Sequence, residues 1–365
     1  MKKFLLILFL VSFLVIQLRS QNDAPSVAVS AYVDCYYATD NDYSIDEVYS
    51  MRRLSYINGK KNQFGLNTTQ INVDGSWKMC RSSVSLQFGD LSKTAYQAQT
   101  SPTASIQQAY IGVKLVDNLW IDAGYLLTHM GSELLLPKDN WLTSHSIVTY
   151  FEPFYQAGVR GSYETDKLTA QIYLLNGNGI TDDNNKNKTI GLFLSYKPNN
   201  SLTISYANIL GNEEPGGPES YKLHALHCIV ASYLVTDKFT IRGQFDYGSK
   251  EITTSNVIDS NMTIVNTING KFIGWSLTGH YQINDELSGT IRFADANNSD
   301  GVYTPIIKGN AITAGIEYKP TANSYIRLEG SYLKLDDKYQ IFKTADWKNS
   351  SNRMEAALNF GIILK

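Results

Sequence analysis

Ionisable side chains occur singly in the middle of segments that otherwise alternate between apolar and small or polar residues. In FTIRGQFDYG, for example, Arg242 and Asp246 alternate with Phe239, Ile241 and Phe245. An arginine that faces lipid near the bilayer midplane costs about 2–4 kcal/mol, and an unpaired charge in a dry protein core is also costly. The same charge facing water costs very little. The spacing therefore predicts charges that line an aqueous interior, where they would attract or repel dissolved ions.

Eight mid-strand charges share this pattern, and we expect all of them to face the interior. Because both signs are present, their balance would determine which ions are favoured. The eight residues are Asp122, Arg160, Arg242, Asp246, Arg292, Glu317, Arg327 and Glu329.

The remaining reactive side chains are not spaced for catalysis or for binding a metal. His224 and His227 are three residues apart, so a strand would place them on opposite faces. The three cysteines are far apart in the sequence and odd in number, which indicates no disulfide framework. We therefore expect no catalytic residues, no metal and no cofactor, and hence no enzyme. The formal net charge of −2 also argues against nucleic acid as a partner.

The elements that would position these charges are segments of about ten alternating residues, separated by turn signals. We count about sixteen such segments between Ser26 and Lys365. QFGLNTTQINVD loses its alternation at Thr68-Thr69, which predicts a β-bulge. KLHALHCIVASYLV is apolar on both faces, so its register stays open. A loop of about twenty residues is expected after Gly248.

Short and long connections alternate along the whole chain. The short ones have two to four residues, and the long ones have roughly ten to twenty-five. This order predicts an all-β fold, a transmembrane antiparallel β-barrel with short periplasmic turns and long extracellular loops. A soluble sandwich has no reason to keep such an order. A barrel of about sixteen strands leaves an aqueous channel, whereas about eight strands would be filled by side chains.

The N-terminal residues predict export from the cytoplasm. Lys2 and Lys3 precede an apolar core from Phe4 to Ile16, which is too short for a spanning helix and is typical of a signal peptide. We expect residues 1–20 to be a cleaved signal peptide and residues 21–365 to be one outer-membrane barrel.

The connection from His129 to Pro153 combines apolar residues with charges and is the third long one along the chain. We hypothesise that it folds into the barrel and narrows it, with Glu133 and Asp139 helping to set the charge of the constriction. The alternative is an extracellular cap that packs on its own apolar residues.

A series of short motifs runs from residue 123 to residue 213. They include Ala123-Gly124-Tyr125, Gly131-Ser132-Glu133, Ser144-His145-Ser146, Gly158-Val159-Arg160, Leu174-Leu175-Asn176-Gly177 and Leu210-Gly211-Asn212-Glu213. In this order they resemble the OmpL-like family of β-barrel porins, which is common in the Bacteroidetes. The resemblance covers nearly the whole chain after the signal peptide. It implies an outer-membrane barrel and a pore, and it implies neither a particular solute nor catalytic residues.

Two functions of different classes are consistent with these features. The first is a porin in the outer membrane of a Gram-negative cell, through which ions and small hydrophilic solutes diffuse passively. The second is a surface-exposed binding or adhesion barrel with a plugged or narrow lumen. In both cases the expected partners are membrane lipid and lipopolysaccharide, and a homotrimer is expected if the protein resembles sixteen-stranded general porins.

Overall fold

The computed structural model describes residues 24–44, 51–96, 103–213, 222–259 and 262–365. The predicted signal peptide, residues 1–20, lies outside them. Sixteen strands close into one barrel: β1 (Ser26–Asp40), β2 (Phe64–Trp77), β3 (Cys80–Phe88), β4 (Ile106–Val116), β5 (Leu119–Leu127), β6 (Tyr155–Glu164), β7 (Leu168–Leu175), β8 (Thr189–Tyr196), β9 (Leu202–Asn212), β10 (Leu223–Thr236), β11 (Phe239–Asp259), β12 (Met262–Gln282), β13 (Leu287–Asn297), β14 (Lys308–Thr321), β15 (Ser324–Leu335) and β18 (Asn352–Leu364). The connections contain α2 (Asp90–Thr94), η1 (Thr103–Ser105), η2 (Pro137–Asp139), η3 (Thr149–Phe151) and a small sheet of β16 (Phe342–Lys343) and β17 (Asn349–Ser350).

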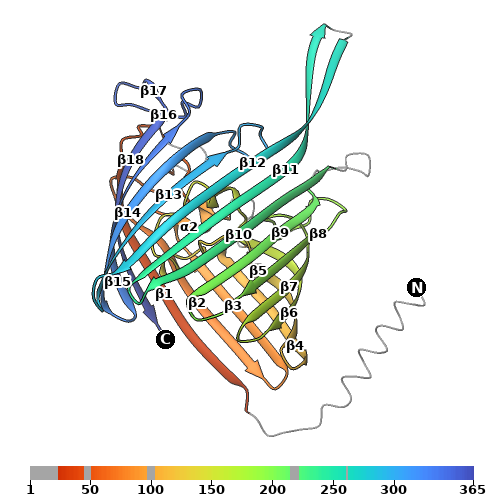
Figure 1. The fold of residues 1–365 in the computed structure, drawn as a ribbon, viewed down its shortest axis with the longest axis vertical. Coiled ribbons are helices and arrows are strands. Elements are labelled where there is room, and N and C mark those ends of the chain that lie inside the picture. The colour runs from red at the N-terminus through yellow and green to blue at the C-terminus, as the bar shows by residue number, and fades with distance from the viewer. Residues whose placement is uncertain (1–23, 45–50, 97–102, 214–221, 260–261) are drawn as a thin grey trace, which may run out of the picture.

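Each barrel strand pairs antiparallel with its neighbours, and β1 closes the ring against β18 (Figure 1). The predicted all-β antiparallel barrel of about sixteen strands is therefore confirmed. The predicted bulge is also present. Asp34 of β1 pairs with Thr68, whereas Cys35 pairs with Leu66, so Asn67 is the extra residue.

Alternation along the strands separates an apolar outer face from a polar inner face. On β13, Ile291 and Phe293 are exposed on the outside, whereas Thr290 and Arg292 are buried on the inside. The outer face therefore presents a continuous apolar surface of the kind that lipid covers. Among the described residues, no helix is both long and apolar enough to cross a bilayer.

The prediction of a loop of about twenty residues after Gly248 is wrong. β11 and β12 instead stay paired without a break from Phe239 opposite Tyr281 to Val257 opposite Thr263. Main-chain hydrogen bonds in this ladder satisfy backbone groups that a loop would leave to water. The resulting hairpin projects far beyond the rest of the barrel (Figure 1).

The register of β10, which the sequence left open, follows from what packs inside the barrel. Leu226 and Cys228 face inward and are buried in a cluster that includes Val148 and Phe151, from the connection between β5 and β6. The inner face of β10 is apolar because it contacts protein rather than water.

Candidate functional site

The connection between β5 and β6, residues 128–154 and called L3 below, crosses the inside of the barrel. Its Glu133 forms an ion pair with Arg292 on β13, a strand that stands opposite β5 in the ring. Glu329 on β15 accepts hydrogen bonds from the backbone N–H of Thr143 and from the Ser144 hydroxyl, the latter at 2.8 Å. These contacts join L3 to the inner face of the far wall. L3 therefore lies inside the barrel rather than forming an extracellular cap.

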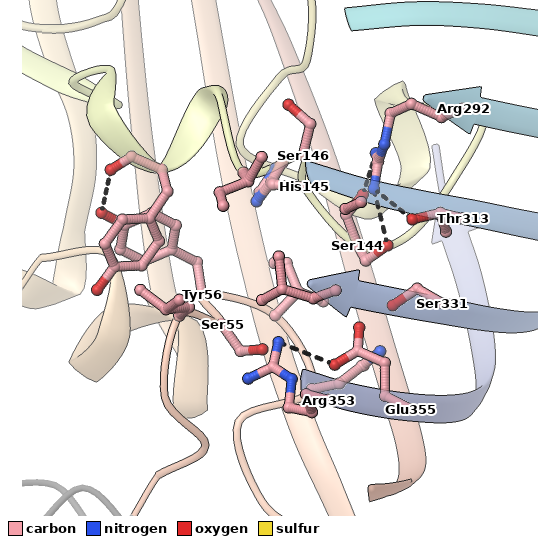
Figure 2. Close-up of a pocket in the computed structure, with 17 residues that line it drawn as sticks. Ser55, Tyr56, Ser144, His145, Ser146, Arg292, Thr313, Ser331, Arg353 and Glu355 are labelled. Atoms are coloured by element: carbon pink, nitrogen blue, oxygen red, sulfur yellow. Dashed lines mark hydrogen bonds and ion pairs between the residues drawn. The ribbon is translucent and has the colours of Figure 1, made fainter. Parts of the chain in front are cut away.

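Arg292 and Glu133 form the first anchor of L3. The guanidinium of Arg292 also donates to the Ser144 carbonyl at 2.7 Å and to the Thr313 hydroxyl at 3.2 Å (Figure 2). Burial alone would raise the pKa of Glu133, but the charge of Arg292 outweighs it together with hydrogen bonds from L3 itself, and the pKa falls to about 2. Glu133 is thus an ionised structural anchor.

Arg327 on β15 forms the second anchor. Its side chain is fully buried, pairs with Glu317 on β14 and donates to the Thr143 hydroxyl at 3.0 Å and to the Asn140 carbonyl at 2.9 Å. A buried arginine is stable only when its donors have partners. The L3 carbonyl and hydroxyl are therefore part of what keeps this charge inside the wall.

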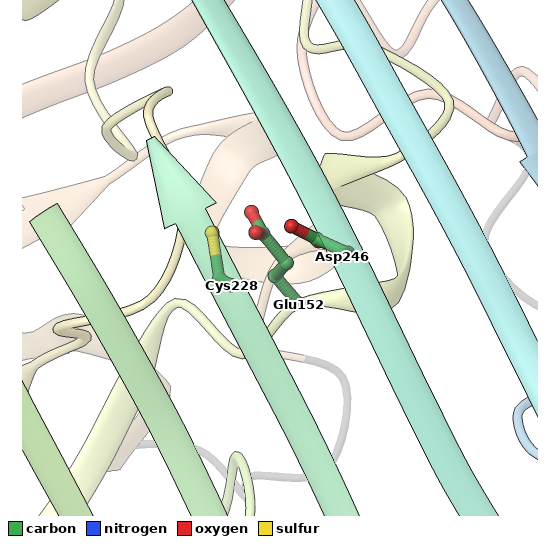
Figure 3. Close-up of side chains that lie close together, drawn as sticks. All are labelled: Glu152, Cys228 and Asp246. Carbon is green, nitrogen blue, oxygen red and sulfur yellow. The ribbon is translucent and has the colours of Figure 1, made fainter. Parts of the chain in front are cut away.

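A third contact joins the end of L3 to β10 and β11. Glu152 of L3, Cys228 of β10 and Asp246 of β11 point toward one another, and all three are buried (Figure 3). The amide of Gln244 donates to Glu152 at 2.8 Å and to Asp246 at 3.1 Å. Burial, followed by the charge of Asp246, raises the pKa of Glu152 well above its usual value.

This third contact is the one group among the described residues with three candidate metal ligands, whose ligand atoms lie within 4.8 Å of one another. A small cation could lie between them. A proton shared by the two carboxylates would relieve the same repulsion, so the contacts by themselves do not call for a metal.

A segment of the β1–β2 connection also enters the barrel beside L3. Tyr56 stacks on Tyr150 of L3 with ring centroids 4.6 Å apart. Figure 2 shows a small cavity between this segment, L3 and the wall, into which His145, Arg353 and Glu355 project. The two connections thus pack against each other inside the barrel.

The wall from β3 to β8 lies away from the anchors. In register across it, Arg81, Gly112, Asp122 and Arg160 form one row on the inner face. Asp122 is fully buried and accepts from Arg81 and from Arg160, each with an Nη2–Oδ2 distance of 2.7 Å. A Cβ on Gly112 would lie 2.1 Å from Asp122 Oδ1, so only glycine leaves room for this carboxylate.

A cavity of about 360 Å³ lies between part of L3 and this wall. Its lining includes Leu134 of L3 on one side and Gln108, Tyr110, Arg160 and Gln171 of the wall on the other. L3 is therefore held against β10, β11, β13 and β15, and this cavity remains on the side of β4 to β8.

The structure places all eight predicted charges on the inner face, but in two different environments. Asp122 and Arg160 belong to the row beside the open cavity. The other six lie under L3 or on the wall beside it: Arg242, Asp246, Arg292, Glu317, Arg327 and Glu329. Their role in lining a pore stays a prediction.

The two candidates in L3 also differ from each other. Glu133 is turned to the far wall and neutralised by Arg292, whereas Asp139 is partly exposed beside Lys138 at 3.0 Å. Sequence reasoning missed Arg81, although its alternating position in KMCRSSVSLQFG matches the pattern used for the other charges.

Comparison with known proteins bears on what such a barrel does. The family described as "Putative beta-barrel porin-2, OmpL-like" matches residues 26–362. The chain belongs to this family. The match runs from the first barrel strand into the last, which confirms the resemblance seen in the sequence. The protein is accordingly a porin-type channel of the outer membrane.

Solved structures share the fold of this OmpL-like porin at low sequence identity. The anion-selective porin from Comamonas acidovorans has a TM-score of 0.61 and 11% identity, with 93% of this chain and 100% of that chain covered. OmpF from Salmonella typhi, in complex with daunomycin, has a TM-score of 0.57 and 13% identity, covering 94% and 99%. The trimer form of OmpT from Vibrio cholerae has a TM-score of 0.56 and 12% identity, covering 93% and 100%. No curated protein matches the sequence significantly.

Proposed function

We propose that this porin is a passive pore, not an enzyme, through which ions and small hydrophilic solutes cross the outer membrane. The observation that supports this most directly is the open cavity between L3 and the β4–β8 wall, inside a closed barrel. L3 would act as the constriction, because its anchors fix it across the interior while leaving this side open. The eight inner charges would line the channel or hold L3 in place.

The contribution of L3 to the charge of the pore would differ from the one expected from the sequence. Glu133 is already paired with Arg292, so it would act as an anchor and contribute little to the electrostatic field in the passage. The role proposed for Asp139, a charge of the constriction, is unchanged, and the charge of Lys138 balances it.

Single-channel conductance of the refolded protein in a planar bilayer tests the proposal. We expect discrete current steps, and we expect Leu134→Trp to reduce the step size because Leu134 projects into the cavity with 48% of its surface exposed. Leu115→Trp is the matched control, since Leu115 is similarly exposed on the outer face. Equal conductance for the two variants would contradict a passage beside L3. Deleting Gly131–Leu142 should enlarge the steps.

The projecting β11–β12 hairpin favours a second candidate, a barrel that binds a partner at the cell surface. A protein that is folded and inserted but carries no current would support this alternative and rule out the pore.

The partners proposed for the porin are outer-membrane lipid and lipopolysaccharide around the apolar outer face, together with two further copies of the chain. The trimer is supported by the trimeric form of the similarly folded OmpT. Sedimentation equilibrium in detergent should give three times the mass of the chain, and a monomer mass would refute the trimer.

A further inference from the structure

We propose that the open side of the barrel contains a binding subsite for organic carboxylates, built around Arg160 and Arg81, and that this subsite makes the pore selective for anions. The inference rests on the proposed pore function and specifies its solute class. It depends on three features of the interior: a pair of guanidiniums on one buried carboxylate, the direction in which the acids of L3 point, and the lining of the cavity.

The guanidinium pair is held rigidly at the wall. Asp122 lies between Arg81 and Arg160 and is fully covered, whereas the two arginine side chains remain about one-fifth exposed, at 21% and 17%. The guanidinium of Arg81 lies over the ring of Trp120 at 4.3 Å, and that of Arg160 lies near the ring of Tyr110 at 5.5 Å. A solute in the passage therefore meets the cations of this group rather than the carboxylate.

The acids of L3 do not offset these cations on the side of the passage. Glu133 is bound to Arg292 on β13, Glu152 is buried against Asp246 on β11, and the partly exposed Asp139 is paired with Lys138 at 3.0 Å. Arg242 is a further partly exposed cation, which lies over Trp141 at 3.9 Å and makes no ion pair with any described residue. The accessible inner charge near L3 is thus positive on balance.

An exposed carboxylate on the wall opposes this balance. Glu164, at the end of β6 next to the periplasmic turn, lies 3.6 Å from Arg81 with 40% of its side chain exposed. It screens Arg81 more than Arg160, because the ion pair joins it to Arg81. Arg160, which also lines the cavity, is therefore the residue expected to contact the solute.

The rest of the cavity indicates what kind of anion fits. Tyr110, Tyr173, Phe193 and Leu134 supply apolar or aromatic surface, and Gln108 supplies an amide. Pockets of this size bind small molecules through apolar walls and a few fixed polar groups. A carboxylate joined to an apolar or aromatic body matches this lining better than a bare inorganic ion does.

The test uses the full-length protein in planar bilayers under a KCl gradient, with benzoate as the probe. We expect a reversal potential of the sign for chloride preference, and we expect benzoate to reduce the chloride current. Arg160→Gln should lower the chloride-to-potassium permeability ratio about fivefold, the order of effect of one unit charge about 4 Å from an ion in water. It should also raise the benzoate concentration that halves the current about tenfold.

Further variants separate charge from geometry and from misfolding. Arg160→Lys should keep the preference for chloride but weaken the effect of benzoate, because an ammonium lacks the planar pair of donors. Glu164→Gln should increase the preference for chloride, and it leaves the buried Asp122 with both of its partners. Lys197→Gln removes the same charge from an exposed periplasmic turn and should change neither property.

A channel that conducts but prefers potassium would refute the proposed subsite without contradicting the proposed pore. The same conclusion follows if Arg160→Gln conducts with an unchanged permeability ratio and unchanged benzoate sensitivity. Absence of any current from the folded protein would overturn the pore itself, and with it this inference.

Discussion

Replacing Glu133 by glutamine should release L3 from the far wall. The change keeps the size of the side chain but leaves Arg292, which is almost fully buried, without its counter-charge. The pKa of Glu133 falls from the usual 4.5 to about 2 on folding. At about 1.4 kcal/mol per pKa unit, the ionised carboxylate stabilises the docked loop by about 3 kcal/mol. The ratio of docked to undocked L3 should therefore fall by roughly a few hundredfold in Glu133→Gln.

Hydrogen exchange of L3 peptides measures this ratio, because the Ser146 amide donates to Glu133 at 2.7 Å. We expect protection to fall in Glu133→Gln and to stay unchanged in Asp139→Asn, whose carboxylate contacts Lys138 within L3. A lowered pKa stabilises the fold fully above about pH 4.5 and ceases to do so as pH falls through about 2. Wild-type L3 should therefore lose protection over this range while the variant does not. Equal protection in both proteins at pH 7 would refute the anchor.

Two further predictions concern buried groups. Because burial and Asp246 raise the pKa of Glu152, folding disfavours its ionised form. Glu152→Gln should therefore raise the temperature of the heat-induced shift in gel mobility at pH 8 and leave it unchanged at pH 4. No gain at pH 8 would show that the carboxylate has a compensating partner. Gly112→Ala should destabilise the barrel by about 1–3 kcal/mol in urea unfolding, because its Cβ meets Asp122. Gly243→Ala, with no atom within 4 Å, is the control and should change little, and equal midpoints would contradict the steric argument.

The strands and their faces were predictable because each repeats one simple rule. In the last strand, Met354, Phe360 and Ile362 alternate with Arg353 and Glu355, and the structure places the first group outside and the second inside. A period of two, combined with tight turns, is enough to specify an antiparallel barrel. The mixture of apolar and charged residues in L3 was compatible with a constriction inside the barrel and with an extracellular cap, and the contacts with the far wall decide for the inside position.

What could not be predicted depends on contacts between distant segments. The sequence gives no local sign that Glu133 binds Arg292, or that Leu226 packs on Val148, because each pair meets only when the ring closes. Six of the eight charges that were expected to face water instead lie under L3 or beside it. No local pattern in the sequence predicts the path that L3 takes inside the barrel. The projecting hairpin was missed because its residues are polar enough to be expected in a loop, whereas strand pairing there is continuous.

The path of L3 also makes the width of the passage depend on strands that lie far along the chain. Its anchors on β13 and β15 follow it in the chain: Arg292 comes 159 positions after Glu133, and Glu329 comes 186 positions after Thr143. L3 can bind these partners only when β13 and β15 stand in the same ring as β5 and β6. The narrow passage therefore depends on contacts between distant parts of the chain, and a closed barrel in which L3 is not docked would be a wide and unselective hole in the membrane.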